Sequence, residues 1–325
     1  MPIALTRRLV LRTAAAAAIA ATTHAQAQTL PRTVTLHVGF PAGGPADILA
    51  RLVAEQFGKA SGSTVIVMNK PGAGATLAAA GVAQLAPDGA NLLLVSSGHA
   101  GAPALYPDLS FNNRTSFTPI VALAQSPVVI LVRKQSPFQT IGELVEGARA
   151  RSGKLQFGNS GGATLPALAA ALLGKQLGYD ALAVPYRGSG PGNTDVLAGV
   201  IDANFDIVSG AMGLLASGDM RGLAVTSVQR SSALPEIPTI AETLKPGFEV
   251  IGWFGILAPA QMDEALAARF NAEFNRILLN DEFKARLRAL GIEPIGGTAQ
   301  AFDTLIASET NRWGRLIREL GLTAQ

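Results

Sequence analysis

Short apolar runs alternate with helix-length amphipathic segments over most of this chain. Strand-like runs occupy residues 33–40, 64–69, 91–97, 127–132, 155–159, 182–186, 204–208 and 222–227. Segments with helical spacing of apolar residues lie between many of these runs, for example at 46–60. Strands that alternate with helices predict an α/β fold, with mostly parallel sheets covered by helices on both faces.

The C-terminal quarter has a different pattern. A long apolar run at 250–259 is followed by two predicted helices, at about 263–290 and 299–320, and Thr298 is a plausible N-cap of the second. About three strands precede residue 125, and several more lie between 127 and 227. We therefore expect two α/β lobes, with residues 28–126 plus 251–325 in lobe 1 and residues 127–250 in lobe 2.

The first 27 residues have the features of an export signal. Arg7, Arg8 and Arg12 precede an apolar run, and Ala25-Gln26-Ala27 is a small-x-small cleavage site. The apolar run is too short to span a membrane. Because TRRLVLR is similar to the twin-arginine export pattern, that route and the general secretory route both stay open. The signal predicts a periplasmic location for the mature chain.

Charge and composition exclude several functions. The chain has 26 Lys+Arg and 23 Asp+Glu, so removal of the three signal arginines leaves 23 against 23. A balanced charge gives no basic surface to attract nucleic acid. There is no cysteine and two histidines are left after the signal, so we expect neither disulfides nor a metal site.

Four glycine-containing loops follow predicted strands: FPAGGPAD (40–47), NKPGAGAT (69–76), SSGHAGA (96–102) and GNSGGAT (158–164). In open α/β sheets, ligands bind beyond the carboxyl ends of the strands, and glycine lets the backbone approach a ligand closely. The loops at 40–47, 69–76 and 158–164 match neither the dinucleotide fingerprint nor the P-loop. We therefore expect a ligand site without a cofactor.

The spacing of Gly158, Ser160 and Gly162 is that of a nucleophile elbow. A catalytic serine needs a base, but the three histidines, His24, His37 and His99, all precede Ser160. This excludes the hydrolase order Ser…Asp/Glu…His, although a trypsin-like order would leave His99 as the base. The favoured interpretation is a loop whose N–H groups face an anion at a helix start. The alternative is a tight turn that binds nothing.

Other candidate residues lie at strand ends and in the loops. Asp47 either offsets the dipole in the first turn of its helix or holds a ligand amine, and Arg51 is placed to pair with it. Ser97 and His99 belong to the third loop. The two residues that end apolar runs in the second lobe and are candidates to point into a cleft are Tyr186 and Asp206.

Seven stretches resemble one known family in the family's order: FPAGGPADILARL, VIVMNKPGAGATLAA, PDG (87–89), VPYRGSGP, LAVTSVQR, LPEIPTIAE and GWFGILAPA. Over nearly its whole mature length the chain resembles the periplasmic solute receptors of tripartite tricarboxylate transporters, the Bug receptors. The resemblance implies a type II periplasmic-binding-protein fold, in which two lobes close on a small carboxylate and deliver it to the permease subunits of the transporter. A monomer is expected.

The resemblance also assigns ligand-holding roles to loop residues. In the second lobe these are Ser160, Gly161, Gly162 and Thr164, and in the first they are Phe40, Ala42, Gly43, Gly44 and Asp47. The chain departs from the family pattern at Ala163, where glycine is usual, and at Ala167, where histidine is usual. Two alternatives to a transport receptor stay open. One is a secreted serine hydrolase or carboxylate-converting enzyme, and the other is a ligand-sensing partner of a membrane sensor kinase.

Overall fold

The computed structural model describes residues 29–151, 153–161, 164–186 and 188–322, so the predicted signal segment and Gly162 lie outside the described residues. The strands are β1 (Thr33–Val38), β2 (Thr64–Asn69), β3 (Asn91–Ser96), β4 (Phe117–Arg133), β5 (Gln156–Asn159), β6 (Leu182–Pro185), β7 (Ala203–Ile207), β8 (Met220–Val225), β9 (Ile251–Pro259) and β10 (Glu293–Pro294).

The helices alternate with these strands as the sequence predicts. They are α2 (Pro45–Ser61), η1 (Ala73–Ala75), α3 (Thr76–Val82), α4 (Gly98–Leu105), α5 (Ile141–Arg151), α6 (Leu165–Leu177), α7 (Ser189–Ala198), α8 (Val208–Ala216), α9 (Ile240–Thr243), α10 (Glu264–Leu279), α11 (Asp281–Ala289) and α12 (Ala299–Leu320). No helix among the described residues combines the length and the apolar character that crossing a bilayer requires.

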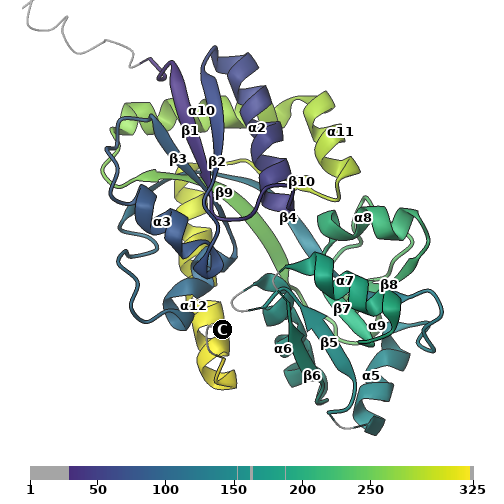
Figure 1. The fold of residues 1–325 in the computed structure, drawn as a ribbon. Coiled ribbons are helices and arrows are strands. Elements are labelled where there is room, and N and C mark those ends of the chain that lie inside the picture. Colours follow the sequence, from purple (N-terminus) through teal and green to yellow (C-terminus); the bar gives the residue numbers. More distant parts are fainter. Residues whose placement is uncertain (1–28, 152, 162–163, 187, 323–325) are drawn as a thin grey trace, which may run out of the picture.

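Two α/β halves share one sheet (Figure 1). The strand order is β2-β1-β3-β9-β4-β7-β5-β6, with β8 and β10 also paired to β4. The triplets β2-β1-β3 and β6-β5-β7 are parallel, as the alternating pattern predicts. β9 and β4 run antiparallel to their neighbours between the two triplets. Helices cover both faces of each half.

β4 belongs to both halves. It pairs with β9 from Phe117 to Pro127, and from Val128 onward it pairs with β7 and β8. We place the boundary between the lobes at this change of partner, and lobe 1 and lobe 2 below keep the residue ranges given above. The sequence predicts a strand only at 127–132, because the polar residues Thr118, Gln125 and Ser126 interrupt the apolar run before it.

The predicted helix at 263–290 consists of two helices. Asn280 leaves the helical conformation (φ −68°, ψ 124°), and its side chain accepts a hydrogen bond from the N–H of Phe283, so it ends α10 and caps α11. The Thr298 cap is confirmed, since its hydroxyl accepts from the N–H of Ala301. α10 packs on α2 through stacked rings of Phe57, Phe270 and Phe274, which close the lobe 1 core.

Thr226 links the segments that pass between the lobes. It is fully buried, and its Oγ1 lies 2.9 Å from the Val128 nitrogen, 3.2 Å from the Val128 carbonyl oxygen and 2.5 Å from the Val250 carbonyl oxygen. Backbone bonds on both sides of Thr226, from its own N–H to Val128 and from the Val250 N–H to Thr226, complete the link. One side chain therefore holds the end of lobe 2 against the middle of β4.

Replacement of Thr226 by valine keeps the side-chain shape and removes this link. Because the N–H of Val128 is then buried without a partner, we expect Thr226→Val to lower the free energy of unfolding by about 1–3 kcal/mol. Urea denaturation measures this change. Thr304→Val is the matched control, since it removes an exposed hydroxyl that bonds only to the Gln300 carbonyl. Equal stability of the two variants would contradict the assignment.

Candidate functional site

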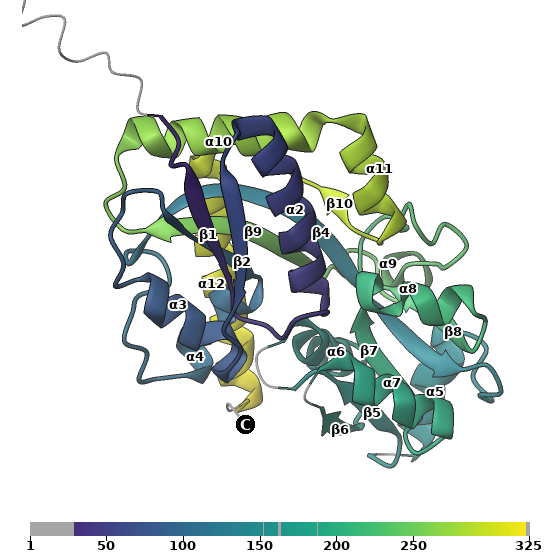
Figure 2. The ribbon, with the colours of Figure 1, turned by 45° about the horizontal axis from the view of Figure 1, so that its top comes forward.

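The helix starts of the two lobes face each other. In lobe 1, α2 and α4 begin after the carboxyl ends of β1 and β3; in lobe 2, α6, α7 and α8 begin after β5, β6 and β7. Figure 2 shows the start of α2 on the side of lobe 1 that faces lobe 2. A Cβ added to Gly252 on β9 would lie 3.8 Å from the Ser97 Oγ and 2.9 Å from a methyl group of Leu165. These two residues begin α4 and α6, so the carboxyl ends of both parallel triplets meet at Gly252.

Asp47 organises the first loop of lobe 1. It is 2% exposed, and its oxygens accept from the Gly43 N–H, the Arg51 Nε and the Asn69 Nδ2 at 2.9, 2.9 and 3.0 Å. Asn69 also donates to the Phe40 carbonyl, which ties the loop to β2. The hydrogen bond from Arg51 holds the pKa of Asp47 below its usual value, although burial opposes this. The predicted pair of Asp47 and Arg51 is confirmed.

These bonds change the interpretation of the first loop. Gly43, which the resemblance assigns to the ligand, gives its N–H to Asp47 instead, and it adopts φ +81° to do so. Asp47 has a donor on each oxygen, which gives it a structural role. Phe40 packs partly into the lobe 1 core, whereas Ala42 is exposed and Gly44 is half-buried at the start of α2. The surface that this loop offers to a ligand is therefore formed by Ala42 and Gly44.

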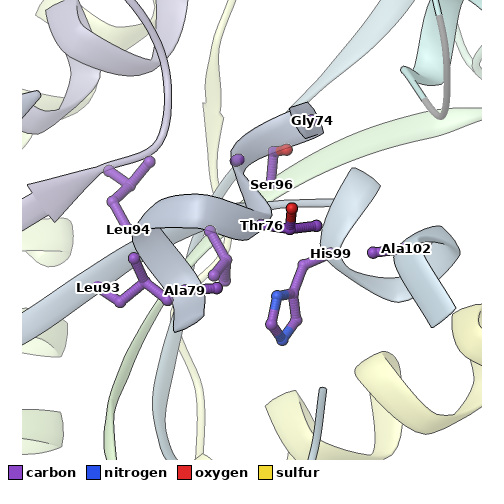
Figure 3. A pocket seen from close by; sticks show the side chains of 10 residues that line it. Gly74, Thr76, Ala79, Leu93, Leu94, Ser96, His99 and Ala102 are labelled. Atoms are coloured by element: carbon purple, nitrogen blue, oxygen red, sulfur yellow. The ribbon is translucent and has the colours of Figure 1, made fainter. Parts of the chain in front are cut away.

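His99 is a packing residue at the start of α4. It is 7% exposed, its Nε2 lies 2.7 Å from the Asn113 carbonyl oxygen, and its ring packs on Phe111 and Phe117. Burial lowers the pKa of His99 to about 4, so the ring is neutral at physiological pH. Figure 3 shows His99, Thr76 and Ser96 around a cavity of about 10 Å³. A cavity of this size holds one water molecule at most.

Ser97 connects the third loop to the shared sheet. Its N–H donates to the Trp253 carbonyl of β9 at 2.9 Å, and its hydroxyl lies on the side of Gly252. The residue is 5% exposed. Ser97 is thus the lobe 1 hydroxyl that lies nearest to the beginning of α6.

Lobe 2 has a hydroxyl pair and a buried carboxylate near its helix starts. The Ser160 Oγ lies 3.2 Å from the Ser189 Oγ at the start of α7. Asp206 is fully buried at the end of β7 and accepts from the Asn193 Nδ2 at 2.9 Å and the Ile207 N–H at 2.7 Å. Burial raises the pKa of Asp206, and hydrogen-bond donors around it oppose the rise. Ser160 and Ser189 are both half-buried.

An asparagine pair supports this carboxylate. The Asn204 Nδ2 donates to the Asn193 Oδ1 at 2.7 Å, which turns the Asn193 amide nitrogen toward Asp206. A Cβ on Gly158 or Gly192 would lie 2.6 or 2.9 Å from the Asn204 Oδ1, so both positions require glycine. The sequence analysis assigns no role to Ser189, Asn193 or Asn204. Ser189 lies in the stretch VPYRGSGP that carries the family resemblance, whereas no motif of the sequence analysis includes Asn193 or Asn204.

Of the remaining lobe 2 candidates, Gly161 and Tyr186 form hydrogen bonds within the described part of the lobe, and the Thr164 hydroxyl does not. The Gly161 N–H donates to the Asn159 side chain, and the Tyr186 hydroxyl donates to Asp195 at 2.6 Å, so both are used within the lobe. Burial, helped by the bond to Asp195, raises the pKa of Tyr186 to about 12. Thr164 is the N-cap residue of α6, and its Oγ1 has no hydrogen-bond partner within the described parts of the chain. The Thr164 Oγ1 is itself buried at the start of α6.

The arrangement favours anion binding over nucleophilic catalysis. The hydrogen-bond partner of Ser160 is another hydroxyl, whereas the described histidines bond elsewhere, His37 to Asn91 and His99 to Asn113. In contrast, three helices of lobe 2 start beside Ser160, Ser189 and Asp206, and helix starts carry partial positive charge. Over the described ranges, no group of three side chains is placed to hold a metal ion.

A second cavity, of about 670 Å³, reaches the fourth glycine loop at Asn159. It separates α6 from the end of α12 and is lined by residues that include Asn159, Ala167, Lys175, Tyr179 and Leu320. Lys175 and Glu319 form an ion pair that joins α6 to α12. Ala167, where histidine is usual in the family, borders this cavity, so the departure enlarges space beside α6.

Asp47 gives a pH-dependent prediction. Its folded-state pKa is lowered, so its stabilisation is complete above the unfolded value of about 3.9 and is lost as the pH falls through the folded value. We expect Asp47→Asn to lower the free energy of unfolding at pH 7 by about 1–2 kcal/mol, since the Arg51 partner is half exposed. Urea denaturation should show the gap between wild type and variant shrinking below about pH 4.

Asp281→Asn is the control for this measurement. Asp281 also lies in the first turn of a helix and pairs with a basic residue, Lys284, but its side chain is 97% exposed. We expect a change within about 0.5 kcal/mol at any pH. A gap for Asp47→Asn that stays constant down to pH 2 would show that its carboxylate is not the stabilising group.

Comparisons with known proteins agree with this geometry. A family model described as "Tripartite tricarboxylate transporter family receptor" matches residues 49–322. The UPF0065 protein in the tcbD-tcbE intergenic region of Pseudomonas sp. (strain P51) is 37% identical over 321 residues, 98% of this chain and 96% of that protein. The structure of the periplasmic binding protein BugD is 32% identical with a TM-score of 0.81, covering 90% of this chain and 99% of BugD.

A further structure, R. palustris Rpa4515 with adipate, is 31% identical with a TM-score of 0.84 and covers 90% of this chain and 99% of that one. These likenesses confirm the predicted periplasmic-binding-protein fold and the resemblance to the Bug receptors. The matched range includes the helix starts of lobe 2 and the start of α4, whereas the loop at 40–47 and the start of α2 precede it. The chain belongs to the tripartite tricarboxylate transporter receptor family.

Proposed function

We propose that this chain is a periplasmic solute receptor, without catalytic activity, that captures a small carboxylate and delivers it to the permease of a tripartite tricarboxylate transporter. The observation that carries the proposal is the meeting of helix starts around Gly252. Ser160 lies beside Ser189 at the start of α7, Thr164 caps α6, and a Cβ on Gly252 would lie near both Leu165 of α6 and Ser97 of lobe 1. Helix starts with hydroxyl groups are suited to bind an anion.

The composition of three of the four glycine loops supports the same mode of binding. Among the described residues of the loops 40–47, 96–102 and 158–161 there is no lysine or arginine, whereas the loop 69–76 contains Lys70. A carboxylate held here would be neutralised by helix ends and hydroxyls, each charge-assisted bond contributing about 1.5–3 kcal/mol. The adipate that the Rpa4515 structure contains is a carboxylate of the proposed class.

The alternatives have less support. A serine hydrolase needs a base beside its catalytic serine. Among the described residues, the side chain bonded to the Ser160 hydroxyl is instead another hydroxyl, that of Ser189. A ligand-sensing partner of a sensor kinase would use the same binding site, so it differs in its membrane partner and not in its ligand. Export of the chain by the predicted signal, a periplasmic location and a monomeric state are parts of the proposal that rest on the sequence and on the family.

Identification of the bound acid is the direct test. Protein isolated from its native periplasm is analysed by mass spectrometry under native and denaturing conditions, and the acid that is released is then titrated by calorimetry against ligand-free protein. The expected result is one bound carboxylate, recovered unchanged after incubation. Conversion of the acid to a product would favour an enzyme, and failure of any acid to bind would contradict the receptor.

Gly252 gives a prediction for closure of the lobes. A methyl group at this position would press on Leu165 of lobe 2 and on the Ser126 carbonyl, 3.2 Å away, beside Ser97 of lobe 1. We expect Gly252→Ala to hold α6 away from α4 and to weaken binding of the acid about tenfold or more. Small-angle scattering should show compaction on binding for the wild type and less compaction for the variant.

Gly213→Ala is the matched control, because a Cβ there meets nothing within 4 Å and the residue lies in the middle of α8. This variant should bind and compact as the wild type does. Wild-type affinity and compaction in folded Gly252→Ala would show that the lobes do not close over this glycine.

A further inference from the structure

The cavity of about 670 Å³ beside α6, here called the α6 cavity, lies between the two lobes. Residues of α6, β5 and β6 line it from lobe 2, and Leu320 and Leu322 line it from lobe 1. Figure 1 shows the end of α12 beside α6, and the ion pair of Lys175 with Glu319 joins the two helices. A volume of this size is typical of sites that bind small molecules.

The wall that α6 contributes consists of small residues. Ala167, Ala170, Ala171 and Gly174 line the cavity at spacings of three and four, which places them on one face of the helix. They are half-buried, whereas leucines on the other side of α6 pack into the core. Because these side chains are short, they leave space between α6 and the apolar end of α12. The space suits the apolar part of a ligand.

The α6 cavity reaches the loop of the proposed anion site. Asn159 lines the cavity, and its side chain accepts from the Gly161 N–H, so it borders the cavity and supports the loop. Ala167 follows Thr164, the N-cap of α6, by one turn. From Thr164 to Ala171 the helix rises about 10 Å, at about 1.5 Å per residue. An acid held at the start of α6 can therefore extend an apolar body along the cavity.

The far end of the cavity disfavours a second acid group. Lys175 lines this end, but its charge is paired with Glu319. Asp180, which also lines the cavity, follows the last turn of α6. The C-terminal end of a helix carries partial negative charge, which repels an anion. A carboxylate suits the start of α6, and an uncharged group suits its end.

A buried hydroxyl at the far end lacks a partner. Tyr179 is 8% exposed, its ring packs on Phe157, and its hydroxyl has no hydrogen-bond partner among the described residues. The ring carbon that carries the hydroxyl lies 3.9 Å from the position of a Cβ on Gly174, so this end of the ring lies against the cavity face of α6. A buried polar group without a partner is costly, and an uncharged ligand oxygen would supply one.

We propose that the α6 cavity is a subsite for the apolar body of the ligand, and that this receptor therefore selects monocarboxylates with an extended apolar body over short acids and over dicarboxylates. This inference rests on the proposed receptor function and narrows its ligand class. The acid group lies at the helix starts, and the apolar body lies between α6 and the end of α12. Because both lobes line the cavity, a ligand that fills it contacts both.

A series of acids tests the selection. The probes are butyrate, hexanoate and octanoate, with suberate as the dicarboxylate matched to octanoate, each titrated by calorimetry against ligand-free protein. From butyrate to octanoate, each added methylene should tighten binding about twofold to fourfold. Octanoate should bind about tenfold or more tightly than suberate, because the second carboxylate of suberate would lose water at the end of the cavity that Asp180 lines.

Ala171→Leu tests the cavity itself. A leucine side chain would occupy space that the chain of octanoate requires, so the preference for octanoate over butyrate should fall about tenfold. Ala167→His narrows the cavity at the end beside the loop and should lower the same preference. Thermal melts establish that each variant is folded. An unchanged preference in the folded variants, or an equal loss of affinity for both acids, would overturn the inference.

Ala150→Leu is the matched control, because it adds the same side chain to an exposed position of α5 in the same lobe. It should keep the wild-type preference for octanoate over butyrate. A fall in this control equal to that in Ala171→Leu would show that the effect does not come from filling the cavity.

The failures of the two proposals are distinguishable. If wild-type protein binds butyrate or suberate as tightly as octanoate, the inference about the α6 cavity is wrong and the receptor function stands. The same holds if none of these probes binds but another carboxylate does. If no carboxylate binds at all, the receptor function itself is contradicted.

Discussion

The pairing of β4 with strands of both lobes is the constraint on which the other features depend. Nearly every residue from Ile120 to Val132 is buried, so the strand cannot leave either lobe without exposing apolar surface to water. β9 pairs with it up to the boundary at Pro127, and Thr226 fixes the end of lobe 2 to it. This frame sets the distance between the two rows of helix starts, and Gly252 leaves room for them to approach.

Hydrogen bonds within the loops at these helix starts keep the loops ordered. The Gly43 N–H bonds to Asp47, and the Gly161 N–H bonds to Asn159, so two groups that looked available for a ligand keep the loops rigid. A site that is ordered before binding loses less entropy when the ligand arrives. In the proposed receptor, the groups left for the ligand are hydroxyls and helix ends, which are suited to an anion.

Asp47 and Asp206 show how the surroundings decide the role of similar residues. Both are buried acids next to a helix start. Arg51 lowers the pKa of Asp47, whereas burial raises that of Asp206. The first carboxylate bonds to the loop before its helix, and the second accepts from the Asn193 side chain and the Ile207 N–H within lobe 2. The sequence alone does not distinguish the roles of these two residues.

The sequence by itself determined the class of fold, the places of most helices and strands, and the pairing of Asp47 with Arg51. These follow from local spacing, because apolar periodicity and contacts four residues apart depend only on neighbours along the chain. It could not determine the early start of β4, the break at Asn280 or the roles of Ser189, Asn193 and Asn204. Only the tertiary structure decided those, because Ser160 and Ser189 are 29 positions apart and meet only when parallel strands align their carboxyl ends.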